Sequence, residues 1–221
     1  MDETLWPLVV AVATFVASHL VPATPAVRGR LIRRLGARGY FLGYGLLSLV
    51  LVAVVAVTFR AAPHVEVWPQ EPWMRWLPIL TMPVASVLIL AGMTTPNPFS
   101  VGPTGRGFDP ARPGLLRLTR HPVLWGMTIW AAPHAVVNGD VAALLLFVPM
   151  LALSLLGIPW LEWKRRLALG ADFDRLAAAT SRPRTFSLME VGFWRIGLGL
   201  VLYAVLTWLH PVLLGVSPLP G

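Results

Sequence analysis

The feature that most constrains this chain is a series of six long apolar runs separated by shorter polar segments. The runs lie at roughly 5–21, 40–59, 76–93, 122–137, 141–160 and 193–214. Most are close to the ~20 residues that a helix needs to cross a bilayer. A helix satisfies its own backbone hydrogen bonds in lipid, which an isolated strand cannot do. We therefore expect an all-α fold, an integral membrane bundle of about six transmembrane helices that forms a single domain over residues 1–221.

The composition agrees with a membrane protein and excludes several kinds of site. Hydrophobic residues make up 56% of the chain and charged residues 13%, whereas soluble domains are roughly 25% charged. Because there is no cysteine, disulfides, thiolate metal ligands, c-type haem attachment and cysteine nucleophiles are excluded. We find no carboxylate pair, Ser-His-Asp pattern or phosphate loop in the sequence, which argues against a hydrolase.

The positive charge lies mainly in alternate loops. Fifteen of the 18 Lys and Arg residues fall in the segments that follow the first, third and fifth runs. By the positive-inside rule these segments face the cytoplasm, and both termini face the periplasm. The net charge of +8 thus indicates contact with the lipid bilayer rather than with nucleic acid. We expect a multi-pass membrane protein.

Histidines in such a chain are candidates for function, because ionisable groups are costly at membrane depth. His19 closes the first run and His121 opens the fourth, so both lie near the cytoplasmic side. Two imidazoles from different helices at one depth can hold a b-type haem. The alternative is that each is a solvated residue at a helix end. His134, near the outer end of the fourth run, either lines a cavity or caps the turn predicted at "NGD", 138–140.

The segment before the fourth run is rich in Pro and Gly and cannot continue a helix. Pro122 suits the first turn of a helix, so we expect the fourth helix to begin at His121 or Pro122. Arg120 and His121 then lie beside the free N–H groups of the helix N-terminus. That position suits an anion such as a haem propionate or a phosphate.

Four stretches together resemble the NnrU family of bacterial membrane proteins. They are "ASHLVPATPAVRGRLIRRLGARGY" at 17–40, "TPNP" at 95–98, "LLRLTRHPVLWG" at 115–126 and "WAAPHAVVNGD" at 130–140. The resemblance implies an inner-membrane protein of denitrification that supports nitrite and nitric oxide metabolism. The family is also similar to 15-cis-zeta-carotene isomerase, a membrane enzyme with a histidine-ligated haem b. The histidines that match are His19 and His121, although this chain has no Cys to act as a thiolate ligand.

A more distant resemblance is to the isoprenylcysteine carboxyl methyltransferases and related phospholipid methyltransferases. Their RHPxYxG motif is matched by "RHPVLWG", with Leu124 in place of the Tyr. Their downstream glutamate pair is matched only by Glu162. In those enzymes these groups bind S-adenosylmethionine, which is the cofactor that this alternative implies.

We therefore carry three hypotheses, and the sequence does not decide whether the protein is an enzyme. In the first, His19 and His121 are axial ligands of haem b, Arg120 pairs with a propionate, and His134 is a further cofactor-binding candidate. The protein then carries out redox or isomerase-like chemistry, with a hydrophobic small molecule or an electron-transfer partner. The second is a membrane methyltransferase that uses S-adenosylmethionine. The third is a cofactor-free membrane scaffold or assembly factor.

Overall fold

The computed structural model describes residues 4–101, 105–182 and 185–219. Each of the six apolar runs lies in a helix, which confirms the prediction of an all-α membrane-type fold. The helices are α1 (Trp6–Leu20), α2 (Pro25–Ala61), α3 (Trp76–Thr94), α4 (Pro122–Asn138), α5 (Val141–Leu169) and α7 (Phe193–Leu214). The short helix α6 (Ala171–Ala177) and the 3₁₀ turns Pro72–Arg75, Gly114–Arg117 and Leu188–Glu190 lie in the connections.

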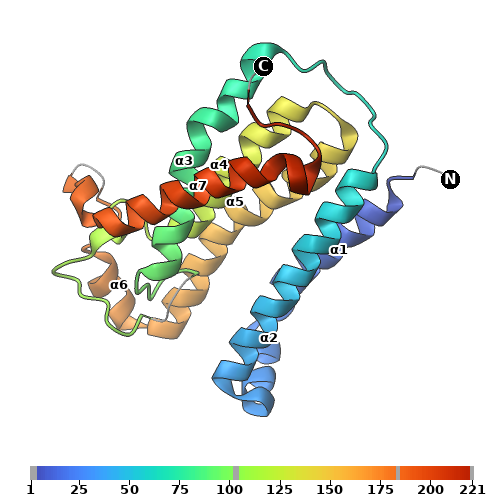
Figure 1. Ribbon diagram of the computed structural model, residues 1–221. Coiled ribbons are helices and arrows are strands. Elements are labelled where there is room, and N and C mark those ends of the chain that lie inside the picture. The colour runs from blue at the N-terminus through green and yellow to red at the C-terminus, as the bar shows by residue number, and fades with distance from the viewer. Residues whose placement is uncertain (1–3, 102–104, 183–184, 220–221) are drawn as a thin grey trace.

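The helices form two groups. α3 packs against α4 and α7, and α4 packs against α5, while α1 and α2 form a pair that meets the rest mainly through α1 and α5. Figure 1 shows this pair leaning away from the other helices toward the end that carries α6. The shared core lies at the opposite end, where Leu8 and Val12 of α1 pack with Ala135 of α4 and with Phe147 and Met150 of α5.

Close approach of α4 to α3 depends on two glycines. A Cβ at Gly126 would lie 2.9 Å from the carbonyl oxygen of Ala85, and a Cβ at Gly92 would lie 2.9 Å from the ring of Pro122. Small residues let membrane helices pack backbone to backbone. Gly126, part of the "RHPVLWG" stretch, therefore serves helix packing and fixes where α4 begins relative to α3.

Four helical segments are long and apolar enough to cross a membrane: Pro25–Ala61, Pro72–Thr94, Val141–Leu169 and Phe193–Leu214. α1 has 15 residues and α4 has 17, so they rise only about 22 and 25 Å. The hydrocarbon core is ~30 Å thick. These two helices reach full depth only with help from the connections at their ends.

The basic segment after the first run is helical, contrary to our expectation of a loop. α2 begins at Pro25, after the extended residue Thr24, and carries the five arginines of that segment. Proline suits the first helical turn and arginine is a good helix former. The helix breaks at Gly36, which has φ 70° and ψ 164°, a conformation that glycine adopts at little strain. The part of α2 before Gly36, which carries four of the five arginines, is thus a separate short helix joined to the rest by a kink.

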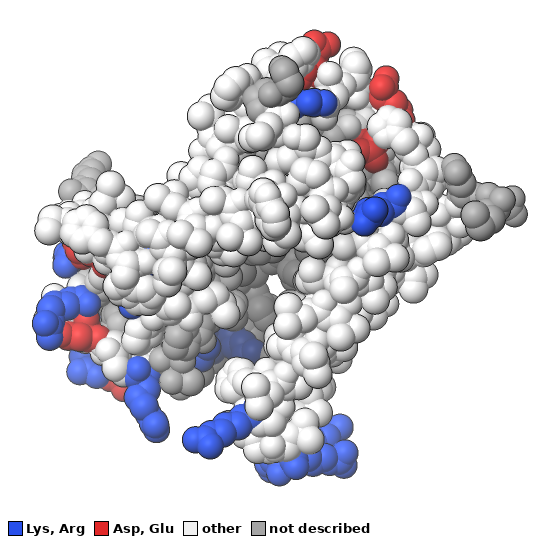
Figure 2. All heavy atoms as spheres, viewed as in Figure 1, with Lys and Arg blue, Asp and Glu red and all other residues white. Residues whose placement is uncertain are grey.

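The predicted turn between α4 and α5 is confirmed. Gly139 adopts the left-handed conformation at φ 63°, and the Asp140 side chain caps α5 by accepting from the backbone N–H of Ala143. The two helices therefore form an antiparallel hairpin that returns α5 to the level of the α4 N-terminus. Figure 2 shows Lys and Arg side chains gathered mainly at this end, as the alternation of charge predicts.

Candidate functional site

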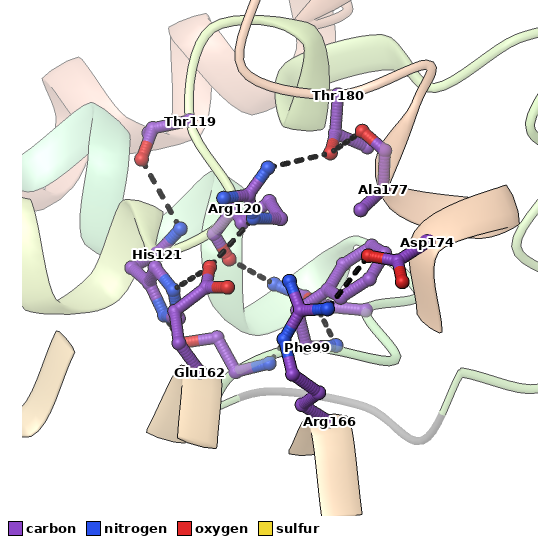
Figure 3. Close-up of polar contacts among 11 residues, drawn as sticks. Phe99, Thr119, Arg120, His121, Glu162, Arg166, Asp174, Ala177 and Thr180 are labelled. Carbon is purple, nitrogen blue, oxygen red and sulfur yellow. Dashed lines mark hydrogen bonds and ion pairs between the residues drawn. The ribbon is translucent and has the colours of Figure 1, made fainter. Parts of the chain in front are cut away.

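Arg120, His121 and Glu162 form a polar cluster where α4 begins and α5 nears its end (Figure 3). Oε1 of Glu162 accepts from Nε of Arg120 at 2.6 Å and from Nε2 of His121 at 2.8 Å. The side chain of His121 is 4% exposed, and those of Arg120 and Glu162 are 23% and 24% exposed. The guanidinium of Arg120 and the imidazole of His121 thus share one carboxylate oxygen in a largely buried site.

The local sequence explains why these side chains meet. His121 is the N-cap residue of α4, and Pro122 starts the first turn. The backbone N–H of His121 donates to Oγ1 of Thr119, and Nη1 of Arg120 donates to Oγ1 of Thr180, which lies after α6. Glu162 is brought opposite by the hairpin of α4 and α5. Three separate segments of the chain therefore fix the cluster.

Asn97, in the "TPNP" stretch, holds the preceding loop against the cluster. Its Nδ2 donates to the carbonyl of Arg120 at 2.9 Å, and its Oδ1 accepts from the backbone N–H groups of Phe99 and Ser100. Asn97 is only 1% exposed, so these bonds are shielded from water. They set the position of Ser100 beside the imidazole.

Ser100 completes a chain of hydrogen bonds that we did not foresee from the sequence. Its Oγ lies 2.8 Å from Nδ1 of His121, so hydroxyl, imidazole and the Glu162 carboxylate follow one another. The order is that of a nucleophile–base–acid set. Ser100 and His121 are each 3% exposed, however, so a substrate does not reach the hydroxyl in this arrangement. The serine orients the imidazole, and nothing in the sequence near Ser100 signals that role.

The protonation state of His121 follows from its surroundings. Burial lowers the pKa of His121 below its ordinary value, although the hydrogen bond and charge of Glu162 act in the opposite direction. The neutral ring has one donor and one acceptor nitrogen. Glu162 can only accept when ionised, so we assign the proton to Nε2, and Nδ1 accepts from the Ser100 hydroxyl.

This arrangement does not fit His121 as an axial ligand of haem. Both of its ring nitrogens are engaged by protein groups, and iron would have to displace one of them. Arg120, expected to pair with a propionate, binds Glu162 and Thr180 instead. The anion expected at the start of α4 is therefore supplied by the chain itself.

The other two candidate histidines lie apart from the cluster. Nδ1 of His19 lies 2.8 Å from the carbonyl of Phe15, and the ring stacks on Phe15 and meets the edge of Tyr44 on α2. Nδ1 of His134 lies 2.7 Å from the carbonyl of Trp130. Within the described residues no hydrogen bond or ring contact joins either histidine to His121, and no three His, Asp or Glu side chains gather as a metal site. The haem ligand set stays a prediction.

Glu162 has one further property that bears on function. Its Oε1 serves both Arg120 and His121, whereas Oε2 has no hydrogen-bond partner among the residues that the structure describes. The open oxygen carries negative charge beside a neutral imidazole. It can accept a hydrogen bond from a ligand or pair with a cationic group. In the sequence, only the methyltransferase resemblance connects Glu162 with this site.

Comparison with known proteins gives one result. The chain matches the family described as "NnrU protein" over residues 7–218. Neither the curated proteins nor the solved structures that were compared gave a match. The matched range includes all of the helices described above except the first residue of α1, together with the "RHP" turn and Glu162. This chain is therefore a member of the NnrU family.

Proposed function

We propose that this NnrU protein supports nitrite and nitric oxide metabolism from the inner membrane, and that Arg120, His121 and Glu162 form its ligand-binding centre. The observation that carries the proposal is the carboxylate shared by arginine and histidine in a site three-quarters or more buried. The link to nitrogen oxides comes from the family resemblance. The multi-pass topology with both termini in the periplasm belongs to the same proposal.

Stability alone gives a weak reason for such a cluster. Burying charged groups is costly, and replacing a buried ion pair by apolar side chains is often neutral or stabilising. Helix packing in this chain does not need an ion pair. Apolar residues are abundant, and the neighbouring helices α3 and α4 already pack closely through glycine. Ionisable groups retained at the edge of a membrane domain are functional candidates for this reason.

The cluster is suited to binding a ligand and to moving a proton. Glu162 holds the Nε2–H of His121 and leaves Oε2 open to a ligand donor or cation. His121, neutral and fixed by Ser100, has Nδ1 as its only unprotonated nitrogen, so a proton that a ligand releases can be taken there if the Ser100 hydroxyl turns away. Arg120 keeps the carboxylate ionised and oriented.

The test is support of nitrite and nitric oxide consumption in a denitrifying bacterium that lacks its own NnrU protein. We expect Glu162→Gln to abolish the support while the protein still reaches the membrane. The matched control is Glu190→Gln, because Glu190 pairs with Arg117 at 2.8 Å and the two side chains are 25% and 26% exposed. Full support by both variants at equal membrane abundance contradicts the proposal, and so does equal loss in both.

A second candidate is a methyltransferase-like protein that binds S-adenosylmethionine at the same centre. The observation that favours it is that Arg120, His121 and Glu162, which match the methyltransferase motif, lie together. The open oxygen of Glu162 can pair with a cationic group of the cofactor. Calorimetry of the purified protein tests this candidate: binding that Glu162→Gln weakens and Glu190→Gln leaves unchanged supports it, and no heat of binding rejects it.

Haem b remains a proposal that rests on the resemblance and on one feature of His19. The Nδ1 contact of His19 with the Phe15 carbonyl leaves Nε2 as the free nitrogen, an orientation that metal-ligating imidazoles often have. His121 would have to leave Glu162 or Ser100 to join it. A spectrum with a Soret band that His121→Ala removes and His64→Ala retains supports this cofactor.

A further inference from the structure

An apolar cleft opens between α1 and α5. Its volume is about 400 Å³, and its walls include Val16 and Leu20 of α1 and Leu153, Leu156 and Trp160 of α5. Figure 2 shows the hollow between the α1–α2 pair and the rest of the molecule, with basic side chains below it. A cleft of this kind between membrane helices takes a hydrocarbon chain.

A cation, Lys164, lies just beyond the residues of α5 that line the cleft. Lys164 follows Trp160 by one helical turn, so the two lie on the same face of α5. Its Nζ donates to the carbonyl of Ala23, in the turn between α1 and α2. Lys164 thus reaches across from α5 to the other wall. Pro149 lies at the far end of the cleft, and α5 rises about 22 Å from Pro149 to Lys164. The hydrocarbon of one leaflet is only ~15 Å deep. The cleft and the lysine together are therefore long enough for an acyl chain and its headgroup.

Two arginines surround this lysine. Arg28, in the short basic helix at the start of α2, lies near enough to Lys164 and Arg165 for the three charges to repel one another. The guanidinium of Arg28 lies over the rings of Tyr40 and Phe41, at 5.9 and 5.8 Å. The aromatic rings hold Arg28 near Lys164 and Arg165.

These cations lack a counter-ion in the described part of the chain. No carboxylate there pairs with Arg28, Lys164 or Arg165, whereas Glu162 is engaged by Arg120 and His121. The Nε of Arg165 is buried with no hydrogen-bond partner, and its Nη2 reaches only the carbonyl of Ser100, at 3.5 Å. A buried donor without a partner is unfavourable. The cluster calls for an anion that comes from outside the chain.

We propose that the cleft and its three cations bind one anionic phospholipid of the cytoplasmic leaflet. An acyl chain lies between α1 and α5, and the phosphate contacts Arg28, Lys164 and Arg165. Basic pockets between helices on the cytoplasmic side are suited to anionic headgroups. The phosphate supplies the negative charge that these three cations lack within the described part of the chain. This site uses other side chains than the proposed ligand-binding centre, which it adjoins at Ser100, and it does not depend on the function of that centre.

The test is native mass spectrometry of the full-length protein in mixed micelles of phosphatidylglycerol and phosphatidylcholine. We expect one retained phosphatidylglycerol. The variant Lys164→Gln/Arg165→Gln should weaken its binding roughly 25-fold, since each basic side chain near an anionic headgroup contributes about fivefold. The control is Arg33→Gln/Arg34→Gln, which removes the same charge from the same membrane face and should retain the lipid.

A second variant tests the cleft without changing charge. Ala152 lines the cleft, so Ala152→Trp should fill it and displace the acyl chain while the cations remain. Equal loss in the two charge variants, equal retention of phosphatidylcholine, or competition by inorganic phosphate alone would each overturn the proposal. Equal loss in the two charge variants would indicate general attraction to the charged surface. Equal retention of phosphatidylcholine would indicate a groove for neutral lipids, and competition by inorganic phosphate would indicate a site for free phosphate.

Discussion

Replacing Arg120 and Glu162 by methionine, singly and together, tests whether their ion pair serves the fold. The pair is 2.6 Å long and its side chains are 23% and 24% exposed. Breaking a fully buried pair costs about 3–5 kcal/mol, and an exposed pair contributes only about 0.2–1 kcal/mol. At this intermediate burial we expect each single variant to lower the free energy of unfolding by about 2 kcal/mol.

The double variant should be far less harmful than the sum of the singles. Both charges are gone, and the Nε2–H of His121 is the group left without its acceptor, which costs about 1 kcal/mol. We therefore expect a loss of about 1 kcal/mol where additivity gives about 4 kcal/mol. Thermal unfolding in detergent measures the difference: the midpoint should fall by about 4–8 °C in each single variant and by about 2–4 °C in the double.

The same variants separate stability from function. The double variant should recover most of the stability and still fail to support nitrite and nitric oxide metabolism, because the carboxylate is absent. A double variant as unstable as the two singles combined would refute the reasoning, since the pair would then be a structural requirement. Recovery of full activity together with stability would refute the functional role of Glu162.

Three further predictions follow from the site and the turn. Burial lowers the pKa of His121 below 6.5, so its full contribution to the free energy of unfolding should be present above pH ~6.5 and should be lost as the pH falls through the lower folded-state pKa. Thermal midpoints measured from pH 5 to 8 should show this loss. His121→Asn should flatten the profile. Gly139→Ala should lower the free energy of unfolding by more than about 2 kcal/mol, because φ is 63° and the added Cβ would lie 2.3 Å from the Trp68 carbonyl. Gly215→Ala, at φ 79° with open space around it, should cost only about 1 kcal/mol, so equal midpoints for the two variants would contradict this account. The third prediction concerns the absorption spectrum of the purified protein. A bis-histidine haem signal that both His19→Ala and His121→Ala remove would show that His121 leaves Glu162 to bind iron. A spectrum without a haem signal would agree with the contact between His121 and Glu162 that we describe.

The helices were predictable because membrane depth demands long apolar runs, and the runs stand out in the sequence. The start of α4 at Pro122 and the turn at Gly139 followed from residues with strong local preferences. The helical form of the basic segment was missed because its arginines read as a cytoplasmic loop. Pro25, which suits the first turn of a helix, and the arginines, which are good helix formers, were the local signals that favoured a helix there.

The candidate site was predictable in part. The sequence identified Arg120 and His121 and the preference of a helix N-terminus for an anion. Only the methyltransferase resemblance connected them with Glu162, because this residue lies about 40 residues further along the chain and the return of α5 is what brings its carboxylate back. Ser100 carried no signal at all. Its position depends on the loop that Asn97 holds in place, a long-range contact without sequence periodicity.

The most direct test of the central claim is the ¹⁵N NMR signal of the His121 ring, assigned by comparison with His121→Asn in histidine-labelled protein. We predict a neutral ring at pH 7, protonated at Nε2 and with a pKa below 6.5, and we expect Glu162→Gln to shift its Nε2 signal. A ring that is charged at pH 7, is bound to a metal, or does not respond to Glu162→Gln would contradict the account.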